Sequence, residues 1–344
     1  MKLMRIAING FGRIGRIFFR QCFGREGLEI VAINDLSNIE NLAYLLKYDS
    51  VYGRWDKDVS IGASDAQKLI IDDKEILVFS EKDPEKLPWK DLNINVVVEA
   101  TGFFTDSEKA SAHIRAGAKK VLITAPTKDD TLVFTPGFEL KESAIVSNAS
   151  CTTNAVNPIL AIMLKTVGVK KAILNTIHAY TATQSIVDGI SSAHGGFASG
   201  GKSDDFRKGR AGAQNIIPST TGAAESTAKV IPEISGKFDG VSLRVPVISG
   251  SIADITFVSE KPTTAEEINN IFREAEKEPR WQGILKVVDE QIVSSDILGE
   301  PFGAIVDLTL TRVVDGDLVK VFSWYDNEWG YAAMLIKHLE SIKI

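Results

Sequence analysis

The chain has 344 residues, 44% of them hydrophobic, and a formal net charge of −6. Its length predicts two domains. The acidic balance argues against nucleic acid as the main partner, because phosphate backbones bind basic surfaces, although a few well-placed cations can still hold a small anion. Since no apolar run approaches the roughly 20 residues that cross a bilayer, we expect no membrane segment.

The start of the chain and its cysteines predict the compartment. A strand-like run begins at Met4, which leaves no space for a signal peptide. The only cysteines are Cys22 and Cys151, too few for a disulfide framework and suited to a reducing environment. We therefore expect a cytoplasmic protein.

The first part of the chain alternates strand-like and helix-like patterns. Helical spacing is expected at Ile14–Phe23 and Ser107–Ala116. The expected strands are Met4–Asn9, Glu29–Asn34, Leu77–Phe79, Asn95–Glu99, Val121–Ile123 and Ala144–Val146. Apolar strands separated by amphipathic helices are typical of a parallel sheet covered on both faces. We predict a Rossmann-type doubly wound α/β domain over residues 1–150.

The pattern changes after Cys151. The strands become longer and more alternating, which favours an α+β domain with a mostly antiparallel sheet over residues 151–329. Strands are expected at Ala172–Tyr180, Val241–Val247, Ile252–Val258, Ile305–Val313 and Leu318–Tyr325, and helices at Thr152–Val167, Gly222–Val230, Thr264–Lys277 and Gly330–Ser341. The last helix, within residues 330–344, is expected to join the first domain. The Gly/Ser/Ala-rich stretch Ile190–Asp205 predicts a loop.

A GxGxxG motif runs from Gly10 to Gly15, between an expected strand and an expected helix. Its glycines suit a tight turn, a close approach to a pyrophosphate and close helix–strand packing. Asp35 lies 20 residues after Gly15, where a ribose-binding acid is expected. Because a carboxylate there repels the 2′-phosphate of NADP, the motif predicts NAD rather than NADP. A plain glycine turn with a surface Asp is the alternative. The predicted contacts are Gly10, Phe11, Gly12, Arg13, Ile14, Asp35, Thr101 and Gly102.

Cys151 lies where a strand passes into a helix. A thiol at a helix N-terminus is favoured as thiolate, and the free N–H groups there can stabilise an oxyanion. A small buried cysteine is the alternative, but polar neighbours from Ser150 to Asn154 argue against it. His178 ends an expected strand among Thr181, Thr183 and Gln184, and is either a base or a structural histidine.

Six segments, in order, resemble the phosphorylating glyceraldehyde-3-phosphate dehydrogenase family. They are NGFGRIGR at the start, SNASCTTN around Cys151, HAYTATQ from His178, NIIPSTTGAA around Thr221, LRVP with Arg244 and WYDNEWGY around Asn327. The resemblance implies that Cys151 attacks an aldehyde. His178 would take the thiol proton, so that the two residues form a thiolate–imidazolium pair. Hydride transfer to NAD would then leave a thioester, which inorganic phosphate cleaves. No metal is implied.

The resemblance also implies how the ligands are held. Asn327 would bind the nicotinamide carboxamide. Thr181 and Arg244 would hold the substrate phosphate, although Arg244 could also be a surface cation in a strand. Inorganic phosphate would be held by Ser150, Thr152, Thr221 and Gly222, with Arg244 near both anions. Partners would be glyceraldehyde 3-phosphate, phosphate and three further copies of the chain, in glycolysis or gluconeogenesis.

The segment between Gly189 and Phe206 is longer than the resemblance leads us to expect, in a loop that lines a neighbouring subunit's cofactor site in the family. Two other functions stay open. One is an erythrose-4-phosphate dehydrogenase, which shares the thiol and histidine but releases a free acid. The other is a thiol redox sensor or regulatory protein on a dehydrogenase scaffold, since an activated thiolate is also oxidisable.

Overall fold

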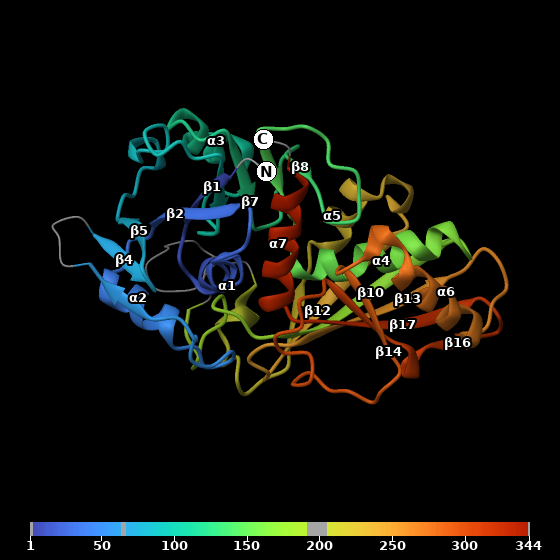
Figure 1. Ribbon diagram of the computed structural model, residues 1–344. Coiled ribbons are helices and arrows are strands. Elements are labelled where there is room, and N and C mark those ends of the chain that lie inside the picture. Colours follow the sequence, from blue (N-terminus) through green and yellow to red (C-terminus); the bar gives the residue numbers. More distant parts are fainter. Residues whose placement is uncertain (1–2, 63–66, 191–204, 343–344) are drawn as a thin grey trace. The chain divides into compact units, whose positions relative to one another are not determined.

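The computed structural model describes residues 3–62, 67–190 and 205–342 (Figure 1). Contacts within the chain divide it into two compact units. The first comprises Met1–Phe134, Glu139–Ala149 and Leu335–Ile344, and the second comprises Thr135–Phe138 and Ser150–Met334. The predicted first domain, residues 1–150 with 330–344, includes Thr135–Phe138 and the start of the last helix, whereas the contacts assign both to the second unit. The domain boundaries stay a prediction. Among the described residues, no helix is both long and apolar enough to cross a membrane.

The first unit is built on a nine-stranded, mostly parallel sheet. In spatial order its strands are β3 (Val59–Ile61), β4 (Lys68–Ile71), β5 (Lys74–Phe79), β2 (Leu28–Asn34), β1 (Met4–Asn9), β6 (Val96–Glu99), β7 (Lys120–Ile123), β9 (Ile145–Ser147) and β8 (Leu132–Val133). Only the β3–β4 and β4–β5 pairs are antiparallel. Helices α1 (Arg13–Cys22), α2 (Ile39–Lys47) and α3 (Ser107–Arg115) and the 3-10 turn η1 (Pro84–Lys86) join the strands. This confirms the predicted α/β class and adds an antiparallel edge.

The order of the parallel strands reverses between β1 and β6. From β1 the chain crosses through α1 to β2 on one side, and from β6 it crosses through α3 to β7 on the other. Because such crossovers are right-handed, the two helices must cover opposite faces, and Figure 1 shows them on either side of the sheet. The carboxyl ends of β1 and β6 therefore flank a crevice, the usual ligand site of a doubly wound sheet.

The second unit holds an eight-stranded, mostly antiparallel sheet. Its strands are β11 (Ile217–Thr220), β12 (Phe238–Val245), β10 (Lys171–Ala179), β13 (Ser251–Val258), β17 (Leu318–Tyr325), β15 (Ala304–Asp307) and β14 (Leu285–Val288), with β16 (Arg312–Val314) paired to β17. Its helices are α4 (Cys151–Lys165), α5 (Ala223–Val230), α6 (Ala265–Lys277) and the start of α7 (Trp329–Ser341), with 3-10 turns η2 (Phe206–Gly209), η3 (Pro232–Ile234), η4 (Pro279–Trp281) and η5 (Leu308–Leu310). The predicted α+β architecture is confirmed.

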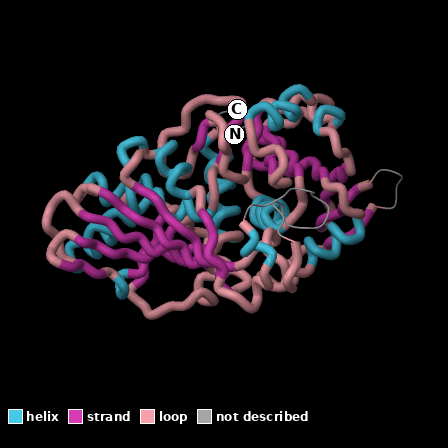
Figure 2. Tube along the Cα trace, turned by 180° about the vertical axis from the view of Figure 1, so that it is seen from behind, coloured by secondary structure: helices cyan, strands magenta, loops and turns pink. Residues whose placement is uncertain are grey.

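Strand alternation gives this sheet two different faces. Leu174, Ile255 and Val321 point to one face and form a core with Ile159 and Met163 of α4. Burying each such side chain contributes about 1.5–3 kcal/mol, so α4 is fixed on the sheet by its middle turns. The opposite face is seen in Figure 2, where the strands lie in front of the helices.

The structure corrects one expected strand and adds elements that the sequence did not reveal. Ile305–Val313 is not continuous: β15 ends at Asp307, and η5 precedes β16. The Asp307 carboxylate causes the break, because one oxygen accepts hydrogen bonds from Thr309 N at 3.0 Å and Thr309 Oγ1 at 2.6 Å. Helix α2 and strands β3, β4, β8, β11 and β14 were not expected. The expected loop at Ile190–Asp205 lies mostly outside the described residues.

Candidate active site

The glycine motif of the first unit forms the turn between β1 and α1. Gly10 has φ of +93°, and a Cβ there would lie 2.6 Å from Thr101 N, so this position requires glycine. A Cβ on Gly15 would lie 2.2 Å from Gly10 O, whereas Gly12 has open space around it and is exposed. The turn thus brings Gly10 against Thr101, while the Gly12 backbone stays open to a pyrophosphate. These features fit a bound dinucleotide.

Asp35 follows β2 directly and supports the glycine turn. One carboxylate oxygen accepts a hydrogen bond from Phe11 N at 2.7 Å, and the other accepts one from Ser37 N at 2.9 Å. The carboxylate therefore lies beside the glycine turn, as a ribose-binding acid should. Of the other predicted contacts, Ile14 is half-buried in the first turn of α1, and Arg13 forms an ion pair with Asp49.

A buried polar network under Thr101 was missed by the sequence reasoning. The Glu99 carboxylate accepts hydrogen bonds from Asn9 Nδ2 at 2.6 Å and Thr101 N at 2.8 Å. His113 Nδ1 accepts a hydrogen bond from Trp89 Nε1 at 3.0 Å, so its Nε2 carries the proton and donates to Glu99 Oε2 at 3.1 Å. The network fixes the β6 loop that carries Thr101 and Gly102. A single Glu at the end of an apolar strand was the signal for it.

In the second unit, Cys151 is the first residue of α4. The N-cap is Ser150, whose Oγ accepts a hydrogen bond from Thr153 N at 3.1 Å. The preceding Ala149 has φ of +56°, a left-handed conformation that turns the chain sharply into the helix. The half-buried Cys151 thiol therefore lies at the positive end of the helix dipole.

The Cys151 thiol contacts His178: Sγ lies 3.4 Å from Nε2. His178 is 4% exposed on β10, and parallel pairing with β12 places it opposite Arg244. Arg244 Nη1 lies 2.8 Å from His178 Nδ1 and donates to Ala179 O at 3.2 Å. The structure thus brings together three residues that are far apart in the sequence.

Burial disfavours the charged form of Cys151 and, separately, the charged form of His178. It raises the pKa of the Cys151 thiol, although Arg244 and the Thr152 N–H act in the opposite direction. Burial, and then the nearby Arg244 cation, lowers the pKa of His178 to about 3. A proton that passes from Sγ to Nε2 leaves the pair neutral as a whole, so burial opposes this transfer less than it opposes either charge separately.

Tyr325, which the sequence reasoning also missed, supports both members of the pair. Its hydroxyl lies 2.9 Å from Thr152 Oγ1 and 2.7 Å from Thr176 Oγ1, and its ring meets the His178 ring edge-on at 5.9 Å. Burial raises the pKa of Tyr325, so the phenol stays neutral at physiological pH. It ties the start of α4 to β10.

The side chains predicted to hold anions lie in three local settings. Ser150 and Thr152 belong to the start of α4, and Thr221 and Gly222 lead into α5, where Thr221 Oγ1 accepts a hydrogen bond from Ala223 N at 3.2 Å. Thr181 follows β10, and its hydroxyl lies 2.9 Å from Thr183 Oγ1. Helix N-termini and hydroxyls of this kind suit phosphate.

The amide of Asn327 is oriented by its neighbours. Its Oδ1 accepts hydrogen bonds from Gly250 N at 3.1 Å and Ser251 Oγ at 2.9 Å. The oxygen is thereby occupied, which leaves the amide NH₂ as the group available to a ligand. That polarity suits the carbonyl oxygen of a carboxamide.

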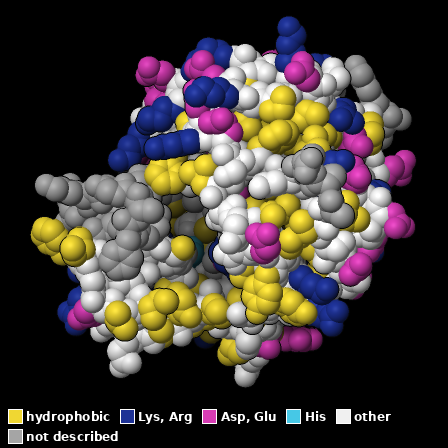
Figure 3. All heavy atoms as spheres, turned by 90° about the vertical axis from the view of Figure 1, so that its left-hand side faces the viewer, with side chains coloured by type: hydrophobic (Ala, Val, Ile, Leu, Met, Phe, Trp, Pro, Cys, Tyr) yellow, Lys and Arg dark blue, Asp and Glu magenta, His cyan; other side chains and the backbone are white. Residues whose placement is uncertain are grey.

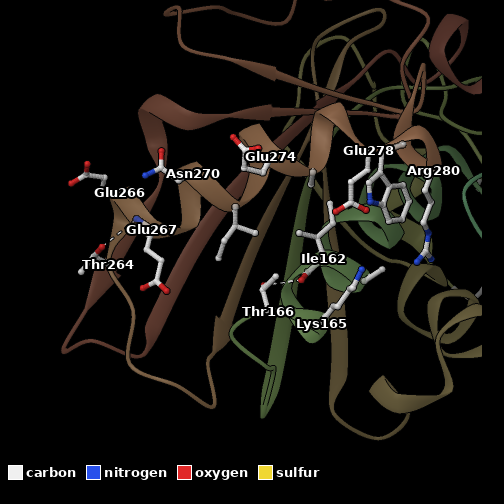
Figure 4. A pocket seen from close by; sticks show the side chains of 14 residues that line it. Ile162, Lys165, Thr166, Thr264, Glu266, Glu267, Asn270, Glu274, Glu278 and Arg280 are labelled. Atoms are coloured by element: carbon white, nitrogen blue, oxygen red, sulfur yellow. Dashed lines mark hydrogen bonds between the residues drawn. The ribbon is translucent and has the colours of Figure 1, made fainter.

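A separate groove of about 550 Å³ lies between α4 and α6. Figure 4 shows Lys165, the last residue of α4, and its C-cap Thr166 on one side of the groove, and Glu267 of α6 on the other. The groove is at the far end of α4 from Cys151, because Lys165 lies roughly 21 Å along a helix that rises about 1.5 Å per residue. It is therefore not the site of the thiol chemistry.

Comparisons with known proteins identify the family. Residues 4–107 match the model of the glyceraldehyde 3-phosphate dehydrogenase NAD binding domain, and residues 150–327 match that of its C-terminal domain. The chain is 50% identical to a glyceraldehyde-3-phosphate dehydrogenase of Thermotoga maritima over 98% of both chains. It is 45% identical to one of Clostridium pasteurianum, over 98% of both, and 47% identical to a cytosolic one of Trypanosoma brucei brucei, over 96% of both. The chain therefore belongs to the glyceraldehyde-3-phosphate dehydrogenase family and is an NAD-dependent oxidoreductase that acts on an aldehyde.

Proposed function

We propose that the protein oxidises glyceraldehyde 3-phosphate with NAD and inorganic phosphate to 1,3-bisphosphoglycerate, in glycolysis or gluconeogenesis. The observation that carries the proposal is the contact between Cys151 Sγ and His178 Nε2 beside Arg244. A half-buried thiol, a base and a cation together suit thiol addition to the aldehyde of an anionic substrate. The relatives' printed name supports the same substrate.

The residues would act in the following order. Sγ of Cys151 forms a bond to the aldehyde carbon while its proton passes to Nε2 of His178, and the N–H groups at the start of α4 stabilise the oxyanion. When bound, NAD would supply the hydride acceptor for the oxidation, and the glycine turn and Asp35 would hold it. The product on the enzyme is a thioester at Cys151. Inorganic phosphate then attacks the acyl carbon, the C–S bond breaks and the thiolate is restored.

A dependence on phosphate distinguishes this function from hydrolysis of the thioester. With glyceraldehyde 3-phosphate and NAD, we expect sustained NADH formation, followed by absorbance, only when inorganic phosphate is present. Without phosphate, NADH should stop near one equivalent per Cys151, because the thioester has no acceptor. Sustained turnover without phosphate would contradict the proposal and favour erythrose 4-phosphate as the substrate. Failure of NADP to replace NAD would support the proposed role of Asp35.

The open face of the second unit's sheet supports a homotetramer. Four apolar side chains lie in register across four strands of this face: Leu243, Ile177, Ile252 and Trp324. Val241 and Ile173, on the same face, are more than half exposed. Figure 3 shows a further surface on which hydrophobic side chains gather into patches between charged ones. Sedimentation equilibrium measures the assembly directly, and a monomer at micromolar concentration would contradict it.

The proposed location is the cytoplasm. One relative, 47% identical, is named as cytosolic. Both cysteines are free, and Cys151 must stay reduced to act as a nucleophile, which a reducing compartment ensures. Fluorescence microscopy of the tagged protein in its own cells would test this location, and a signal confined to another compartment would contradict it.

A further inference from the structure

A chain of buried side-chain hydrogen bonds crosses the carboxyl edge of the first unit's sheet. Asn34, Asn9 and Glu99 end β2, β1 and β6 in register. Asn34 Nδ2 donates to Asn9 Oδ1 at 2.7 Å, and Asn9 Nδ2 donates to Glu99 Oε2 at 2.6 Å. The bonds therefore run across the place where the strand order reverses. Asn9 and Glu99 are each 1% exposed, which puts the chain of bonds beneath the crevice rather than in it.

The backbone of Glu81 fixes the orientation of both amides. Glu81 N donates to Asn34 Oδ1 at 2.8 Å, and Asn34 Nδ2 donates to Glu81 O at 2.9 Å. Because the Asn34 oxygen faces a donor, its NH₂ is the group that faces Asn9. Asn9 must then accept with its oxygen, and its own NH₂ is presented to Glu99.

Glu99 accepts hydrogen bonds on both of its carboxylate oxygens. Trp89 Nε1 can only donate to His113 Nδ1, so the ring proton of His113 is on Nε2, 3.1 Å from Glu99 Oε2. The other oxygen accepts from Thr101 N at 2.8 Å and from the Thr101 hydroxyl. With Asn9, four donors converge on Glu99, and only an ionised carboxylate has acceptors for all of them.

The two ends of this chain of bonds carry the two walls of the cofactor site. Asp35 follows Asn34 directly, and Thr101 lies two residues after Glu99. In a doubly wound sheet, each half of the strand series holds one mononucleotide of a dinucleotide, on either side of the reversal. Asn9 lies between the halves and is bonded to both. A shift of either wall would leave a buried donor or acceptor unpaired, which is costly.

We propose that Asn9 and Glu99 are positioning residues that hold the wall with Asp35 and the wall with Thr101 at the separation that NAD requires. Both side chains are almost fully buried, so they act through the backbone of the turns that follow them. The inference depends on NAD binding, which membership of the family shows, and not on the proposed substrate.

The test exchanges the donor and the acceptor of one hydrogen bond. Asn9→Asp places a carboxylate against that of Glu99, and Glu99→Gln replaces one acceptor oxygen by an NH₂. We expect each single variant to raise the KM for NAD at least about tenfold, with a smaller effect on kcat, because the two walls lose their common support. Calorimetry with NAD alone should show the same loss of affinity.

The double variant Asn9→Asp/Glu99→Gln restores the bond with its direction reversed. The new carboxylate accepts from Asn34 and from the new amide, whose oxygen accepts from Thr101. His113 Nε2 lies 3.3 Å from Asn9 Nδ2, so it too can donate to the new carboxylate. We expect the KM for NAD to return to within about threefold of that of the unaltered protein, since residues in one network do not act additively.

A buried amide at the opposite edge of the same sheet is the matched control. Asn95 precedes β6 and is 7% exposed, and its Oδ1 accepts a hydrogen bond from Arg5 N of β1 at 2.8 Å. Asn95→Ala should lower the melting temperature but leave the KM for NAD unchanged. That outcome separates a loss of stability from a loss of cofactor positioning.

Two results would overturn the proposal: folded single variants with an unchanged KM for NAD, or a folded double variant no better than Glu99→Gln. The second comparison decides even if Asn9→Asp alone does not fold, which circular dichroism reports. A phosphate-dependent enzyme whose variants keep their NAD affinity contradicts only this inference, not the proposed function.

Discussion

Replacing Cys151 by Ser is expected to lower turnover by at least about 10³-fold while NAD binding is retained, because a serine hydroxyl stays protonated where a thiol can ionise. The substitution changes one atom at the start of α4 and leaves the Ser150 cap and the Tyr325 contacts in place. The measurements are NADH formation by absorbance and NAD affinity by calorimetry.

Cys22 provides the matched control for this experiment. It is 1% exposed in the first unit, and burial raises its pKa to about 12, so it is neither accessible nor ionised near neutral pH. Cys22→Ser should therefore keep full activity. Substantial turnover of Cys151→Ser would rule out the thioester route, and loss of NAD binding would show that the variant is misfolded.

His178→Asn is expected to reduce turnover by about 10²–10⁴-fold, the range typical of a lost general acid–base group. Asparagine can keep a polar contact near Ala179 O but cannot accept the thiol proton. Alkylation of Cys151 near neutral pH should slow as well, because the thiolate loses its imidazolium partner. Stopped-flow kinetics and iodoacetamide labelling measure the two effects.

The buried histidine of the first unit serves as a comparison. His113→Asn disturbs the Glu99 network beneath Thr101, so it should weaken NAD binding but leave the alkylation rate of Cys151 unchanged. Equal alkylation rates for His178→Asn and the unaltered protein would mean that His178 does not activate the thiol.

Local patterns predicted those parts of the fold whose contacts are local. The Gly10–Gly15 turn, β1 and β17 have apolar spacing or glycine requirements that can be recognised from a few residues. Strand β15 ends early because Asp307 bonds to Thr309, an effect of one side chain within an otherwise apolar run. The short strands β3 and β8 contain too few residues to show a period.

The residues of the candidate site could be predicted where a local motif marks them, but not where they depend on contacts between distant strands. Cys151 and His178 were identified by motif, and the structure places them in contact. The contact between Arg244 and His178 depends on the parallel register of β10 and β12, which no local pattern encodes. The support from Tyr325 depends on a strand about 150 residues further along the chain.

The Tyr325 phenol also makes the distance between thiol and base independent of the length of the surface loops. Cys151 is next to Thr152, and His178 is two residues beyond Thr176, so one hydroxyl on a central strand sets the separation of thiol and base. All three anchors lie in α4, β10 and β17. Insertions between Gly189 and Phe206, where this chain is longer than expected, need not alter the distance between Sγ and Nε2. The geometry of the reaction centre is therefore set by the packed elements α4, β10 and β17 rather than by the length of this segment.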